Sequence, residues 1–105
     1  HKYAAQDSPG QSQVIAYLEE LGYNVQAEAH IWYISIDAMV DGCTGVEFDG
    51  PTHYLWQSLR PTGKTLMKRR ILEVLLRKLV VIPYYEWPSD HMARLDYLRS
   101  ALGSG

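Results

Sequence analysis

The sequence predicts an α/β domain in which a small mixed sheet is flanked by helices, and three observations support this fold class. Apolar residues have helical spacing up to Gly22 and alternate afterwards, which is typical of a helix followed by strands. Two alternating runs meet at Asp41-Gly42, a dipeptide that favours a hairpin turn. The continuous apolar run 79–82 follows an amphipathic segment, and such a run is typical of a strand buried on both faces.

The first half of the chain should form one helix and three strands. Ser8 is the predicted N-cap of the helix and Pro9 its first residue, while Gly22 suits a left-handed stop. Three strands follow, of which the last two flank the hairpin turn. The apolar face predicted for the second strand comprises Trp32, Ile34, Ile36 and Ala38.

The second half should contribute a helix over about 64–78, the buried strand, and a last helix that Ser89 caps. The apolar stripe predicted to face the sheet consists of Met67, Ile71, Val74 and Leu75. Another face of the same helix carries Lys64, Lys68 and Arg69. The predicted element order is therefore helix, three strands, helix, strand, helix.

Length and composition predict a single domain over 1–102, with 103–105 as a flexible tail or a cloning remnant. An apolar content of 47% argues against disorder, and no apolar run approaches the about 20 residues of a membrane span. There is no charged and then apolar leader, so we expect any targeting segment to lie outside this stretch. The lone Cys43 excludes an internal disulfide and a multi-cysteine zinc site, and we expect it to pack as a small hydrophobe.

The net charge of −2 hides an asymmetry between the two halves of the chain. Residues 1–50 contain one basic and eight acidic residues, whereas residues 51–105 contain nine basic and four acidic residues. Seven of those nine basic residues fall between Arg60 and Lys78. This clustering predicts a local cationic surface that suits a phosphate backbone.

Chemically active side chains gather at the end of the third predicted strand. Glu47 and Asp49 alternate with apolar residues there, so both carboxylates should lie on one face of the strand. Antiparallel pairing across the hairpin should bring Asp37 close to Glu47. The three carboxylates form a candidate metal site, because hard oxygen ligands suit Mg²⁺ or Mn²⁺. His53, which follows the strand, is the first candidate for a proton donor or acceptor.

Each of these features also has a structural interpretation. Carboxylates at a strand end are commonly solvated, and a loop histidine is commonly a hydrogen-bonded residue. The basic helix face can be a solvated surface, on which one cation pairs with Glu47 or Glu73. The aromatic residues Tyr84, Tyr85 and Trp87 can form a flap over the core, with at least one ring packed inward.

Three motifs, in this order, resemble the RAP domain. They are Val-Glu-Phe-Asp-Gly-Pro-Thr-His-Tyr at 46–54, Gly-Lys-Thr-Leu-Met-Lys-Arg-Arg-Ile-Leu at 63–72 and Ile-Pro-Tyr-Tyr-Glu-Trp at 82–87. The resemblance covers nearly the whole chain, from Ser8 to Leu102. It implies an RNA-binding module of a larger mitochondrial or, alternatively, plastid protein, which acts in transcript processing, stability or translation. Helical repeats of the same full-length protein often precede such a module, and no membrane is involved.

The same resemblance implies a restriction-endonuclease-like α-β-β-β-α-β core, similar to the PD-(D/E)XK nucleases and to the very-short-patch repair endonuclease. On that comparison Asp37 corresponds to the first nuclease Asp and Glu47 to the second acidic residue. Asp49 departs from the pattern, because it stands where these nucleases have Lys. Lys68 is then the candidate for a displaced ammonium group. A repair-endonuclease-like metal site would instead combine Asp37 or Asp49 with His53.

The sequence supports three hypotheses about function, each from a different class of protein. As a binding module, which needs no cofactor, the domain would hold the phosphates of single-stranded RNA with cations and stack its bases on aromatic rings. The residues expected to do so are Arg60, Lys64, Lys68, Arg69, Tyr54, Trp56 and Trp87. As a metal-dependent endoribonuclease, it would use Mg²⁺ or Mn²⁺ on the carboxylates, Lys68 for charge stabilisation and His53 for proton transfer. A protein-docking module that uses the aromatic loops is a third alternative.

Overall fold

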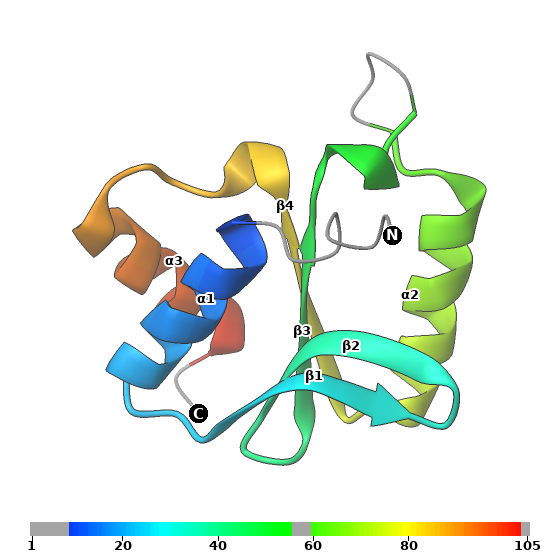
Figure 1. Cartoon of the computed structure of the whole chain (residues 1–105), viewed down its shortest axis with the longest axis horizontal. Helices are drawn as coiled ribbons and strands as arrows, with labels where there is room; N and C mark the ends of the chain where they lie inside the picture. The colour runs from blue at the N-terminus through cyan, green and yellow to red at the C-terminus, as the bar shows by residue number, and fades with distance from the viewer. Residues whose placement is uncertain (1–8, 56–59, 104–105) are drawn as a thin grey trace.

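The computed structural model describes residues 9–55 and 60–103, and a four-stranded sheet forms its centre. Helices cover both faces of the sheet, with α1 and α3 together on one face and α2 on the other (Figure 1). In chain order the elements are α1 (Pro9–Glu20), β1 (Val25–Ile31), β2 (Ile34–Val40), β3 (Thr44–Asp49), η2 (Pro51–His53), α2 (Gly63–Leu75), β4 (Lys78–Pro83), η3 (Tyr84–Glu86) and α3 (His91–Leu102). None of the helices in the described ranges is long and apolar enough to cross a membrane.

The sheet is mixed and has the strand order β1-β2-β3-β4. β1 pairs antiparallel with β2, and β2 pairs antiparallel with β3. β3 pairs parallel with β4, and α2 supplies the crossover that a parallel pair needs. The predicted α/β fold class and order of elements, including the C-terminal helix, are therefore confirmed.

Each face of the sheet has its own apolar core. The larger one joins α1 and α3 to the sheet and contains Val14, Leu18, Ala38, Val40, Val46, Val80, Ile82 and Leu98. The smaller one lies under α2 and contains Ala29, Ile36 and Leu72. Because this second core is small, α2 needs further contacts to hold its place on the sheet.

The turns confirm the predictions made from their residues. Asp41 and Gly42 have φ angles of 52° and 76°, the left-handed pair that a tight hairpin turn requires. Gly22 has a φ angle of 95° just after α1. Cys43, in contrast, is exposed beside the hairpin turn, so the expectation that it packs inside is wrong.

Helix α2 is rotated relative to the sequence prediction. The stripe expected to face the sheet is exposed, by 65% at Met67, 40% at Ile71, 84% at Val74 and 37% at Leu75. Thr65 and Leu72 are buried instead. The prediction is wrong because the sheet beneath α2 carries two buried carboxylates, which require the cationic face of the helix.

Two smaller predictions also need correction. Trp32 lies in the turn between β1 and β2 with a φ angle of 59° and is 80% exposed, so it does not belong to the apolar strand face. Asp90 rather than Ser89 caps α3, since its carboxylate accepts a hydrogen bond from the Ala93 N–H at 3.0 Å. The predicted cap Ser8 lies outside the described residues.

Candidate functional site

Two carboxylates are buried on the face of β3 that α2 covers. Glu47 is 5% exposed and Asp49 is 2% exposed. Their neighbours Val46 and Phe48 point to the other face, where they belong to or pack against the larger core. A buried carboxylate must be paired with a charge or with hydrogen-bond donors, and these two have both.

Glu47 connects three segments of the chain. One of its oxygens, Oε2, accepts a hydrogen bond from the Asp37 N–H at 2.8 Å, and Oε1 lies 2.8 Å from the Lys68 ammonium. Asp37 reciprocates, because its Oδ2 accepts a hydrogen bond from the Phe48 N–H at 2.7 Å. Each carboxylate thus accepts a hydrogen bond from a backbone N–H of the other strand. Both bonds lie just beyond the end of the β2–β3 pairing, which stops at Ala38 with Val46. The prediction that Asp37 approaches Glu47 is confirmed.

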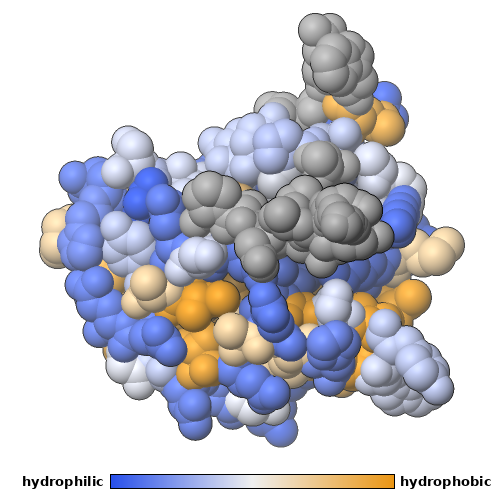
Figure 2. Space-filling view, viewed as in Figure 1, coloured by the Kyte–Doolittle hydropathy of each residue, from blue (hydrophilic) through white to orange (hydrophobic). Residues whose placement is uncertain are grey.

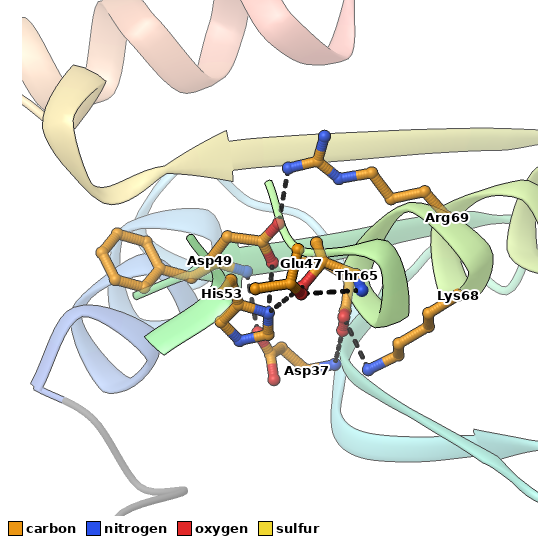
Figure 3. Close-up of polar contacts among 9 residues, drawn as sticks. Asp37, Glu47, Asp49, His53, Thr65, Lys68 and Arg69 are labelled. Carbon is orange, nitrogen blue, oxygen red and sulfur yellow. Dashed lines mark hydrogen bonds and ion pairs between the residues drawn. The ribbon is translucent and has the colours of Figure 1, made fainter. Parts of the chain in front are cut away.

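Asp49 connects the end of β3 with α2 and with η2 (Figure 3). Its Oδ2 accepts a hydrogen bond from the Arg69 guanidinium at 2.7 Å, and its Oδ1 lies 3.7 Å from His53 Nδ1. His53 Nδ1 is also 3.3 Å from the Thr65 hydroxyl. Thr65 is in turn held by Thr62, which caps α2 by accepting a hydrogen bond from the Thr65 N–H. Sequence reasoning missed the threonines, although Thr62-x-x-Thr65 before an apolar run resembles a capping pattern.

The Asp37 carboxyl group has an unusual proton affinity. Burial raises its pKa to about 7, and repulsion from the Glu47 carboxylate adds to the rise. The Phe48 N–H and the Lys68 ammonium act in the opposite direction but do not outweigh these effects. Asp37 therefore changes its charge near neutral pH, close to a carboxylate and an ammonium group.

We expect this pKa to appear in the pH dependence of stability. An unfolded Asp has a pKa of about 3.9, so between about pH 4 and about pH 7 the folded chain binds the additional proton. Relative to an Asp37→Asn variant, the wild type should lose free energy of unfolding as the pH rises through this window. Urea denaturation of both proteins at a series of pH values measures the difference. Parallel stability curves would contradict the shifted pKa.

Tyr54, one of the aromatic residues predicted to stack on RNA bases, lies deeper than expected. Tyr54 is 6% exposed, and its ring packs against Tyr84 and Tyr85 at centroid distances of 5.5 and 5.6 Å. Burial raises the pKa of its hydroxyl group, and the nearby Asp49 carboxylate adds to this rise. The Arg69 guanidinium lies close enough to act on this pKa in the opposite direction, although the Tyr54 hydroxyl oxygen and Arg69 Nε are buried without a hydrogen bond of normal geometry among the described residues.

Trp87 is enclosed by side chains from several elements. Its ring makes edge contacts with Tyr17, Phe48 and Tyr97 at centroid distances of 5.9, 6.4 and 6.0 Å. The Arg94 guanidinium lies 5.2 Å from its centroid, and its indole N–H donates a hydrogen bond to Gln13 Oε1 at 3.1 Å. This environment favours the structural interpretation of Trp87.

The predicted cations divide into two groups. Lys68 and Arg69 are partly buried and paired with Glu47 and Asp49, whereas Arg60 and Lys64 are exposed. Trp56 lies outside the described residues. Tyr85, which the sequence analysis named for a flap over the core and not among the RNA-binding residues, is 45% exposed beside Tyr54.

The arrangement as it stands does not fit a metal ion. Glu47 and Asp49 each already have a cation on one oxygen and a second polar partner near the other. Across residues 9–55 and 60–103, no group of three or more His, Cys, Asp or Glu side chains lies close enough together to hold a metal. A divalent cation would have to displace the Lys68 ammonium or the Arg69 guanidinium. What the site does in this arrangement is to hold α2 against β3 through paired charges.

Comparison with known proteins connects this site to a family. A family model described as the RAP domain matches residues 46–101. The "RAP domain-containing protein, chloroplastic" of Oryza sativa subsp. japonica is 29% identical over 103 residues, which cover 89% of this chain and 16% of that protein. The mitochondrial FAST kinase domain-containing protein 1 of Mus musculus is 50% identical over 44 residues, which cover 38% of this chain and 5% of that protein. The chain thus spans only a small part of either relative, and both relatives are named as organellar proteins.

Proposed function

Because this chain belongs to the RAP domain family, as its motifs predicted, we propose that it is an RNA-binding module of a larger organellar protein. That protein would act in transcript processing, stability or translation, in a mitochondrion or alternatively a plastid. The helical-repeat region of the same protein would supply most of the sequence specificity. This domain would then bind single-stranded RNA weakly and with a strong dependence on salt.

The observation that carries the proposal is the set of exposed groups along one edge of the domain. The β-bridge between Tyr54 and Pro61 brings the segment before α2 beside the tyrosine cluster. Arg60 and Lys64 are exposed at this edge, and Tyr85 offers a partly exposed ring. In Figure 1, η2, η3 and the beginning of α2 lie along the same upper edge. Cations beside an aromatic ring suit the backbone and bases of a single strand.

The test is a filter-binding titration of a single-stranded RNA at several salt concentrations. Replacing both Arg60 and Lys64 by Ala should weaken binding to every RNA sequence alike. It should also flatten the salt dependence by about 0.7 per lost phosphate contact, since each contact releases counterions. The control is Arg99→Ala, which removes an exposed cation of α3. An unchanged affinity in the folded double variant would contradict the proposal.

A metal-dependent nuclease is the second candidate. It would require the metal to displace Lys68 or Arg69 from its carboxylate, and the Asp37 carboxyl is the observation that favours it. Burial, together with repulsion from Glu47, raises the pKa of Asp37 to about 7, and a bound divalent cation would stabilise the charged carboxylate against both effects. Incubation of labelled RNA with Mg²⁺ or Mn²⁺ decides between the candidates. Cleavage by the wild type that disappears in Asp37→Asn, which retains the shape of the side chain, would establish catalysis. RNA binding without RNA cleavage would contradict the nuclease and support the RNA-binding module.

A further inference from the structure

Helix α2 presents an apolar stripe to the outside of the domain. Met67, Ile71 and Val74 are 65, 40 and 84% exposed, and Leu75 beside them is 37% exposed. Figure 2 shows hydrophobic atoms protruding along the edge of the molecule that α2 occupies in Figure 1. Scattered apolar residues are ordinary on a protein surface, but a continuous stripe on one helix indicates an interaction surface.

The packing of the opposite face holds this stripe outward. Rotating α2 to bury Met67 and Val74 would remove Lys68 from Glu47 and Arg69 from Asp49. Two carboxylates that are at most 5% exposed would then lose their cations, which costs more than the apolar burial would contribute. The exposure of the stripe is therefore a stable property of the fold.

The spacing of the stripe matches the seam between two packed helices. Met67, Ile71 and Val74 follow one another by four and then three residues, the alternation with which seam positions repeat in paired helices. None of the three side chains is aromatic, whereas nucleic-acid bases stack on aromatic rings. An amphipathic helix of a protein partner fits such a stripe better than RNA does.

The charges around the stripe specify the partner further. Lys64 and Arg70 of α2, and Arg77 just after the C-cap of the helix, are exposed and make no ion pair with any described residue, while Glu73 is the only acidic residue of α2. The border of the stripe is therefore cationic. A partner with carboxylates beside its apolar seam would complement this border. A second copy of this chain would not, because it would place cations against cations.

We propose that the outer face of α2 is a docking site for an amphipathic helix whose apolar seam is flanked by carboxylates. The partner's seam would cover Met67, Ile71 and Val74, and its carboxylates would face Arg70 and Arg77. This surface adjoins the edge that we assign to RNA at Lys64, in the first turn of α2, while the contacts proposed here at Ile71, Val74 and Arg70 lie further along the helix.

The test uses a synthetic helical peptide of about three heptads, with Leu and Ile in its seam and Glu at the flanking positions. Fluorescence anisotropy should detect binding to the 105-residue chain. Val74→Glu should weaken binding by about tenfold or more, because it places a charge in the apolar seam and opposite the peptide's carboxylates. The matched control is Met92→Glu, which changes a 59% exposed apolar residue of α3 and should leave the affinity unchanged.

Further measurements test the charge preference of this surface and two alternative occupants, a second copy of the chain and a membrane. A matched peptide with Lys in place of Glu should bind much more weakly, and equal binding of both peptides would overturn the assigned charge preference. Self-association of the wild type that Val74→Glu abolishes would make a second copy the occupant. Binding to vesicles of anionic phospholipid without binding to the peptide would make a membrane surface the occupant. Either result would overturn the proposal, and neither depends on whether the upper edge binds RNA.

Discussion

Replacing Arg69 by Ala is expected to lower the free energy of unfolding by about 3 kcal/mol, because it leaves a buried carboxylate without its cation. Asp49 is 2% exposed, and the Arg69 guanidinium donates to it at 2.7 Å. For a domain of this size a loss of about 3 kcal/mol should lower the melting temperature by about 12 °C or more. Thermal and urea denaturation measure both quantities.

Two further variants separate this effect from the general loss of a large side chain. Arg70→Ala changes the neighbouring arginine, which is exposed and has no ion pair with a described residue, and it should leave stability nearly unchanged. Adding Asp49→Asn to Arg69→Ala removes the stranded charge and should recover part of the lost stability. Equal losses in Arg69→Ala and Arg70→Ala would refute the structural role of the buried pair.

Replacing Trp87 by Ala should cost a similar amount, about 3 kcal/mol, since it removes a large ring from a packed environment. The ring contacts Tyr17, Phe48 and Tyr97, and its N–H donates to Gln13. The cost is structural, so RNA affinity of the variant should be unchanged under conditions in which circular dichroism shows that it is folded. A folded variant with weakened RNA binding would instead support the base-stacking role that the sequence predicted for Trp87.

The control for this prediction is an aromatic residue outside the core. Tyr33 is 98% exposed in the turn between β1 and β2, and Tyr33→Ala should change the free energy of unfolding by less than about 0.5 kcal/mol. A Trp87→Phe variant should lie between the wild type and Trp87→Ala, because it retains part of the ring packing but loses the hydrogen bond to Gln13.

Much of the candidate site follows from local sequence. Alternation on β3 put Glu47 and Asp49 on one face, and the Asp41-Gly42 turn set the pairing that brought Asp37 to Glu47. Burial was harder to foresee. Local sequence does not distinguish an aromatic ring that faces solvent from one that faces the interior. The burial of Tyr54 depends on packing against Tyr84 and Tyr85, which lie about 30 residues further along the chain.

The sequence by itself determined the order of the elements, because hydrophobic period, turn residues and helix stops act over a few neighbouring residues. Only the tertiary structure decided which face of α2 is inside. The helix has both an apolar stripe and a cationic face, and the usual rule turns the apolar stripe inward. Here the buried carboxylates of β3, about 20 residues earlier in the chain, require Lys68 and Arg69 beneath the helix, and the apolar stripe is left outside.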